Sequence, residues 1–304
     1  MAAPAAFGER GCGVLSPFER VIDIDLALGE GPVWDEDRQA LWFVDILAPA
    51  LYRLDWPSRA LTRHAMPTDI GSLGLAEGGR LVVALRSGIH LFDPQTESLT
   101  FLVHPEPDLT RVNRMNDGKV GPDGCFWVGS LHDASPRQPT GALYRITPQG
   151  GCTRIVEGVH VSNGLAWTAD GRTMTHADST PGSITAYDFD AATGAVSHPR
   201  RLVTLSEADG RPDGAAFDID GHLWSAGVSA GCLNRISPSG AIERFAVPAP
   251  APTMPCFGGP DRCTLFLTSL AKETPHGRVA GGLFACTAAA TGVAVGRFGA
   301  PPTP

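Results

Sequence analysis

The chain has 304 residues and a formal net charge of −8 at neutral pH, and charged residues make up 18% of it. This acidic balance, without a basic stripe, argues against a surface that follows the phosphate backbone of a nucleic acid. No apolar run approaches the ~20 residues of a membrane-spanning helix, and residues 1–17 lack the basic and apolar regions of a secretory signal. We therefore expect a cytoplasmic protein with neither nucleic acid nor membrane as a partner.

Glycine, proline and cysteine indicate the class of fold. The 36 glycines and 26 prolines are spread along the whole chain, which favours short strands joined by turns over long helices. The seven cysteines are odd in number and irregularly spaced, and none forms a C-x-x-C pair. We therefore expect small buried thiols in a reducing compartment and no disulfide framework.

After an N-terminal arm, residues 1–17, one pattern of a tight turn followed by two strands recurs six times through residues 18–304. The turns begin at Asp37, Gly78, Asp123, Asp170, Asp220 and Asp261. The second strand after each turn covers residues 51–55, 89–93, 142–146, 184–188, 232–236 and 282–286. Units of 40–50 residues with three or four strands are typical of propeller blades. The sequence thus predicts an all-β, single-domain, six-bladed β-propeller with four-stranded antiparallel blades.

Seven residues before each turn, roughly one strand length, lies a position that is polar in four of the six units. The six residues are Glu30, Gly71, Asn116, Asn163, Asp213 and Met254. Asn, Asp and Gly are also common in turns for local reasons, but four in-phase polar residues favour a shared role. Equivalent positions on innermost strands form a ring around the axis, where oxygen ligands can converge on a hard divalent cation.

A second ring is expected eight residues after each turn, where the next strand returns to the same face. It contains Asp45, Arg86, Leu131 beside His132, Asp178, Val228 and Ser269. Strand ends tolerate polar residues in any case. We interpret Asp45, Arg86, His132 and Asp178 as possible lining of a pocket.

Other motifs argue against competing chemistries. Residues 227–231 match the G-x-S-x-G nucleophile elbow, but that motif requires a strand-to-helix turn, and no helix is expected after this strand. The histidines and cysteines do not fall at the spacings of a zinc site. Nothing matches a phosphate-binding loop or a dinucleotide fingerprint.

From about residue 28 to 284, the sequence resembles the senescence marker protein/gluconolactonase/regucalcin family. The matching segments are residues 29–32, 41–46, 113–120, 141–144, 162–165, 212–214, 255–259 and 280–282. The resemblance implies a six-bladed propeller, a metal held by Glu30, Asn163 and Asp213, and substrate contacts from Arg114 and Asn116. It also implies that Asp213 is the catalytic proton donor and acceptor.

One stretch departs from the vertebrate members, which carry a substrate-contacting Glu after the second strand of blade three. Here residues 130–134 read Ser-Leu-His-Asp-Ala, which looks more like bacterial sugar lactonases of the xylonolactonase and gluconolactonase type. We expect Asp133 of this stretch to bind substrate.

These residues lead to the hypothesis of a sugar-lactone hydrolase that opens an aldonolactone to the aldonic acid with one divalent metal ion. Ca²⁺, Zn²⁺, Mn²⁺, Mg²⁺ and Fe²⁺ all accept such ligands. Two alternatives stay open at this stage: a non-catalytic calcium-binding regulatory propeller, and a metal-dependent phosphotriester or aryl-ester hydrolase. The expected assembly is a monomer or a weak homodimer.

Overall fold

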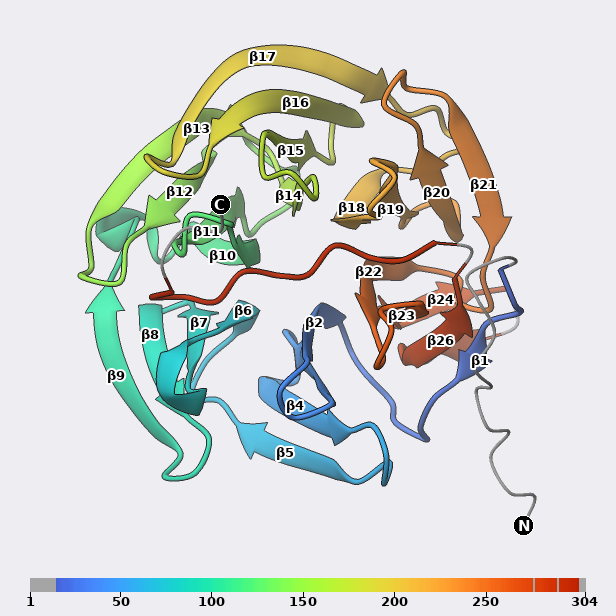
Figure 1. Ribbon diagram of the computed structural model, residues 1–304, viewed down its shortest axis with the longest axis horizontal. Helices are drawn as coiled ribbons and strands as arrows, with labels where there is room; N and C mark the ends of the chain where they lie inside the picture. The colour runs from blue at the N-terminus through green and yellow to red at the C-terminus, as the bar shows by residue number, and fades with distance from the viewer. Residues whose placement is uncertain (1–14, 276, 289, 301–304) are drawn as a thin grey trace.

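The computed structural model describes residues 15–275, 277–288 and 290–300. Its strands form six four-stranded antiparallel sheets arranged as blades around a central axis (Figure 1). The predicted six-bladed β-propeller is confirmed. No helix in these described residues is long and apolar enough to cross a membrane.

The first three blades each run outward from the axis in chain order. Blade one consists of β2 (Gly29–Asp35), β3 (Ala40–Asp45), β4 (Ala50–Asp55) and β5 (Leu61–Ala65). Blade two consists of β6 (Ile70–Leu75), β7 (Leu81–Leu85), β8 (Gly88–Asp93) and β9 (Ser98–Val103). Blade three consists of β10 (Asn113–Val120), β11 (Phe126–His132), β12 (Gly141–Ile146) and β13 (Cys152–Val159). Two short 3₁₀ helices, η1 (Glu77–Gly79) and η2 (Pro107–Leu109), lie in connections.

Blades four and five repeat this order, and blade six closes the ring. Blade four consists of β14 (Ser162–Trp167), β15 (Thr173–Asp178), β16 (Ser183–Asp190) and β17 (Ala195–Thr204). Blade five consists of β18 (Pro212–Phe217), β19 (Leu223–Gly227), β20 (Cys232–Ile236) and β21 (Ile242–Ala246). Blade six consists of β22 (Pro252–Gly258), β23 (Thr264–Ser269), β26 (Leu283–Thr287) and, from the other end of the chain, β1 (Glu19–Arg20).

Strand β1 is the outermost strand of blade six. It pairs antiparallel with β26, with Glu19 opposite Ala285 and Arg20 opposite Phe284, and the Ser16 amide donates to the Thr287 carbonyl at 3.0 Å. A strand from the beginning of the described chain and a strand from its last blade therefore lie side by side in one sheet. Residues 1–14 of the predicted arm lie outside the described residues.

The hydrophobic core is divided into six clusters, and each lies between two adjacent blades. Trp127 and Trp167, for example, pack edge to face between blades three and four with ring centroids 5.9 Å apart. Trp34 and Phe266 stack between blades one and six at 5.8 Å. Alternating side chains on the two faces of each blade supply these clusters, which explains why the innermost strands are buried on both faces.

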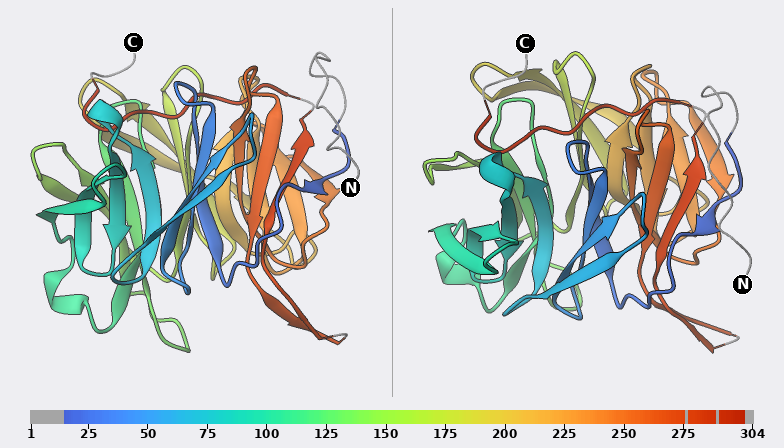
Figure 2. Two further views of the ribbon diagram at one scale, coloured as in Figure 1. Left: turned by 90° about the horizontal axis from the view of Figure 1, so that it is seen from below. Right: turned by 60° about the horizontal axis from the view of Figure 1, so that its bottom comes forward.

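The two ends of the propeller are built differently (Figure 2). The hairpin of β24 (Lys272–Thr274) and β25 (Gly277–Val279) follows the end of β23 and projects from one face. Residues 290–300 run across the opposite face, where the Val293 amide donates to Phe217 at 3.0 Å and the Phe298 amide to Leu75 at 2.7 Å. We call this stretch, residues 290–300, the C-terminal strap.

The cysteines are mostly free. Cys125, Cys152, Cys232, Cys256 and Cys286 are free thiols, and all but Cys152 are buried, as expected for small core side chains. Cys263 is disulfide-bonded, so the expectation of small buried thiols is wrong for this cysteine.

Candidate active site

Every innermost strand contains a break in its pairing near its beginning. The register shifts fall between Glu30 and Val33, Ile70 and Ser72, Met115 and Gly118, Asn163 and Ala166, Pro212 and Ala215, and Pro252 and Pro255. All six positions of the first predicted ring lie at or inside these bulges. Gly31 and Gly164 supply the left-handed φ values, 53° and 65°, that two of the bulges require. A bulge re-aims side chains and is common beside functional sites.

The four polar ring residues are buried. Two of them are joined by a hydrogen bond between blades three and four, and a chain of hydrogen bonds continues from there to the residue before a third. Asn116 Nδ2 donates to Asn163 Oδ1 at 2.8 Å. Asn163 Nδ2 donates in turn to Ser179 Oγ at 2.8 Å, and Ser179 Oγ donates to the Pro212 carbonyl at 2.6 Å. This chain fixes the orientation of the Asn163 amide and ends beside Asp213. The structure thus brings Asn116, Asn163 and Asp213 together from blades three, four and five.

Carboxylates of blades one, three and five share this buried region. Burial, together with the charges of Asp213 and Asp117, raises the pKa of Glu30 well above its ordinary value. Burial and the charge of Asp117 raise the pKa of Asp213 to about 8. Asp117 is itself buried, and its Oδ1 atom makes no hydrogen bond within the described residues. Burial and the proximity of these carboxyl groups therefore disfavour their charged forms unless a cation is bound beside them.

This charge distribution fits a divalent cation. Within the described ranges, no three His, Cys, Asp or Glu side chains form a metal-binding group. The predicted ligand set is of another kind, because it combines two carboxylates with one amide. Glu30, Asn163 and Asp213 offer oxygen atoms, the donor type that hard divalent ions prefer. A bound cation would offset the burial and the carboxylate repulsion that raise the pKa values of Glu30 and Asp213. The residues present are thus compatible with the predicted metal.

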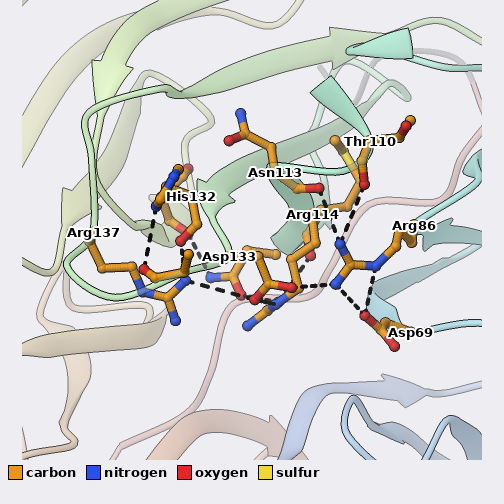
Figure 3. A network of polar contacts seen from close by, with 12 residues as sticks. Asp69, Arg86, Thr110, Asn113, Arg114, His132, Asp133 and Arg137 are labelled. Atoms are coloured by element: carbon orange, nitrogen blue, oxygen red, sulfur yellow. Dashed lines mark hydrogen bonds and ion pairs between the residues drawn. The ribbon is translucent and has the colours of Figure 1, made fainter. Parts of the chain in front are cut away.

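Arg114, predicted to bind substrate, lies at the centre of a second polar network (Figure 3). Its Nη1 donates to Asn116 Oδ1 at 2.8 Å, which links it to the ring. Its Nε donates to Asp133 Oδ1 at 3.2 Å. Burial lowers the pKa of Arg114, while the Asp133 carboxylate opposes that shift. Arg114 therefore connects Asp133 to the ring residue Asn116. The role of Asp133 in binding substrate stays a prediction.

The second predicted ring divides into two groups. Arg86 belongs to the network, because it donates to both Asp69 and Asp133. His132 is next to Asp133, and its carbonyl accepts a hydrogen bond from Arg137. Asp45 and Asp178 instead accept hydrogen bonds from backbone amides of loops, four in the case of Asp45. Their carboxylates stabilise turns, and a role in lining a pocket stays a prediction.

Four residues of these two networks were not predicted to have a role. Ser179 is one residue beyond the position taken for the second ring, so a window of two residues at each strand end would have found it. Asp117 lies in the family-like segment of residues 113–120, but one position after the one that defines the ring. Asp69 and Arg137 lie in loops, where the repeat provides no phase.

A cavity of about 320 Å³ opens at the other end of the axis, under the C-terminal strap. Lys119 and Cys256 lie in its wall, and Lys119 Nζ donates to the Ala215 carbonyl at 2.6 Å. The polar ring residues are absent from this wall. The cavity and the polar ring are therefore separate features of the axis.

A family model described as the SMP-30/Gluconolactonase/LRE-like region matches residues 28–271. The chain belongs to this family. A 6-deoxy-6-sulfogluconolactonase from Pseudomonas putida is 38% identical over 245 residues, which is 80% of this chain and 83% of the relative. Regucalcin from Xenopus laevis is 33% identical over 258 residues, 83% of this chain and 86% of that one.

A solved structure agrees with the family assignment. It is the calcium-binding protein regucalcin from Agrobacterium tumefaciens, which superimposes with a TM-score of 0.83 at 26% identity, covering 95% of this chain and 98% of that one. Members of the family are thus named as sugar lactonases and as regucalcins. The expected resemblance to this family is confirmed.

Proposed function

We propose that this chain is a divalent-metal-dependent hydrolase of sugar lactones, with Glu30, Asn163 and Asp213 as the metal ligands. The observation that carries the proposal is the burial of these three side chains at in-phase bulges of innermost strands. Family membership adds the reaction class, because relatives are named for lactone hydrolysis. The expected product is the open-chain aldonic acid.

In this proposal the chain's own residues bind, orient and move one proton. Arg114 and Asn116 orient the hydroxyl groups of the sugar, since their guanidinium and amide groups border the ring. Asp213 accepts the proton of the attacking water and returns it to the ring oxygen as the ester bond breaks. When bound, a divalent ion would polarise the lactone carbonyl and offset the negative charge that develops on its oxygen.

The test is a pH-indicator assay on a panel of pentono- and hexonolactones. Protein freed of metal with a chelator is expected to be inactive, and adding back Ca²⁺, Mg²⁺, Mn²⁺, Fe²⁺ or Zn²⁺ one at a time should restore hydrolysis with at least one of them. A phosphotriester and an aryl ester, assayed alongside, give lower kcat/KM than the preferred lactone. A higher kcat/KM on either of these esters would assign the site to the other hydrolase class.

Asp213→Asn is expected to abolish turnover, because the amide cannot accept the proton and carries no charge for the ion. The matched control is Asp188→Asn on β16, where the carboxylate is exposed and pairs with Arg200. The control should retain wild-type kcat/KM. Metal-dependent hydrolysis by Asp213→Asn at near wild-type rate would contradict the proton-transfer role.

A second candidate is metal binding without catalysis, because several relatives and a similar structure bear the name regucalcin. Titration calorimetry with Ca²⁺ on the chelated protein separates the two. Calcium binding without hydrolysis of any lactone in the panel would favour the second candidate.

A further inference from the structure

Three guanidinium groups converge on one carboxylate beside the candidate site (Figure 3). Arg114 Nε lies 3.2 Å from Asp133 Oδ1, and Arg86 Nη2 donates to Asp133 Oδ2. Arg137 Nη1 lies 3.8 Å from Asp133 Oδ1 and donates to the His132 carbonyl. Although burial opposes it, the hydrogen bond from Arg86 and the charge of Arg114 hold the pKa of Asp133 below its ordinary value.

The network carries more positive than negative charge. Asp69 Oδ2 accepts two hydrogen bonds from Arg86, from Nη2 at 2.6 Å and from Nε at 2.9 Å. The charge of Asp69 is therefore already paired with that of Arg86. Asp133 alone remains for Arg114 and Arg137. The positive charge of Arg137 also disfavours the charged form of Arg114. Among the ion pairs of the described residues, these three arginines therefore share two carboxylates.

The hydrogen-bonding capacity of Arg137 is mostly unused. Only its Nη1 atom takes part in a hydrogen bond or ion pair among the described residues, and its side chain is 37% exposed. Nη2 of Arg114 likewise makes no such bond there, although this residue is buried. Donors left free beside a buried site suit an anionic oxygen group, because guanidinium binds such groups through parallel hydrogen bonds.

We propose that the lactone accepted by this site carries a phosphate or sulfonate group outside its ring, and that Arg137 binds this group. The inference rests on the proposed lactonase function and adds a substrate class to it. Asp133 holds Arg114 and Arg86 in place by its two oxygens, and Asp69 anchors Arg86 from the other side. Arg137, on the loop after β11, is the specificity-determining residue.

The first test compares three substrates on metal-loaded protein: glucono-1,5-lactone and its derivatives with phosphate or sulfonate in place of the C6 hydroxyl. Wild-type kcat/KM is expected to be roughly 10- to 100-fold higher for at least one anionic lactone than for the neutral one. The two anionic arms identify which group is preferred. Equal or better hydrolysis of the neutral lactone than of both anionic ones would overturn the proposal.

The second test uses Arg137→Gln. This change should remove the preference for the anionic lactone, so that the ratio of kcat/KM on the anionic lactone to kcat/KM on the neutral lactone falls to about one. Arg63→Gln is the matched control, because it removes the same charge from an exposed side chain on β5, the outermost strand of blade one. The control should keep the full preference. An equal fall of Arg137→Gln on neutral and anionic lactones would refute a role in specificity.

A binding measurement keeps the inference testable without turnover. Titration calorimetry with gluconate and with its 6-phosphate and 6-sulfonate forms should show tighter binding of at least one anionic form, by roughly 10-fold or more. Arg137→Gln should abolish this difference. If no lactone is hydrolysed but this pattern appears, the lactonase proposal fails and the anion site stands. If lactones are hydrolysed and Arg137→Gln binds every aldonate like wild type, only the anion site fails.

Discussion

Ser179 links two blades at the candidate metal site through a single hydroxyl group. It accepts a hydrogen bond from Asn163 Nδ2 and donates one to the Pro212 carbonyl, which precedes Asp213. One side chain therefore orients the amide of one proposed ligand and the backbone before another. Residues that orient metal ligands in this way contribute to metal affinity although they do not contact the ion.

Ser179→Ala is accordingly expected to weaken divalent-metal binding roughly 10- to 100-fold while leaving the fold intact. Titration calorimetry on the chelated protein measures the change. Ser183→Ala is a suitable control, because Ser183 is also a buried serine of blade four and its hydroxyl makes no hydrogen bond among the described residues. Unchanged affinity in Ser179→Ala would show that Asn163 does not need this partner to bind metal.

At the scale of single residues, the sequence predicts the site residues that recur at one position of the repeat and misses those that lie outside it. Glu30, Asn116, Asn163 and Asp213 share one phase relative to the turns, so counting from each turn finds them. Asp69 and Arg137 lie in loops whose lengths differ between blades. Their positions depend on tertiary contacts with Arg86 and Asp133, and no local pattern encodes such contacts.

At the scale of single elements, β15 places a histidine behind the candidate site. His176 Nε2 lies 2.7 Å from Ser162 Oγ, and Ser162 precedes Asn163. Burial lowers the pKa of His176 from 6.5 to about 4, although the charge of Asp178 opposes this shift. In the folded protein the imidazole is thus neutral at pH values where the unfolded chain already binds a proton.

This difference predicts acid sensitivity. The folded pKa lies below the unfolded one, so the stability contributed by neutral His176 is fully present above about pH 6.5 and is lost as pH falls toward 4. The loss amounts to about 3 kcal/mol for a shift of this size. Urea unfolding at pH 7 and pH 4.5 should show that the free energy of unfolding decreases less between these pH values for His176→Gln than for wild type. Identical decreases would contradict the assignment.

The elements themselves were predictable to different degrees. Asp-Gly turns and alternating apolar residues locate the second and third strands of each blade, because these features are local. The bulges of the innermost strands were not predicted, since only the register with a neighbouring strand reveals them. The sequence nevertheless contains Gly31 and Gly164, whose left-handed conformations two of the bulges use.

At the scale of the whole molecule, the C-terminal strap joins blades that are distant in the sequence. Phe298 is 3% exposed and packs into the cluster between blades two and three, with Met115, Val120 and Phe126. Its backbone forms a parallel bridge with Ala76. The strap crosses the face opposite to the one from which the β24–β25 hairpin projects, so its contribution should be to stability alone.

Phe298→Ala is expected to lower the free energy of unfolding by about 3–5 kcal/mol, because it leaves a cavity in a buried cluster. At a temperature where the variant stays folded, its kcat/KM on the preferred lactone should match wild type. Phe101→Ala, which truncates a phenylalanine that is 58% exposed, is the control and should change stability by less than about 0.5 kcal/mol. A loss of activity in folded Phe298→Ala would indicate coupling between the two faces.

The pairing of β1 with β26 also bears on how the chain reaches its native state. Glu19 and Ala285 are neighbours in one sheet, yet almost the whole chain separates them, so this contact forms only after the last blade has been synthesised. Contacts between such distant residues are slow to form because loop closure costs entropy. Until β1 pairs with it, the outer edge of β26 is an unpaired strand edge that another chain can occupy. Ring closure is therefore a step at which aggregation can compete with folding.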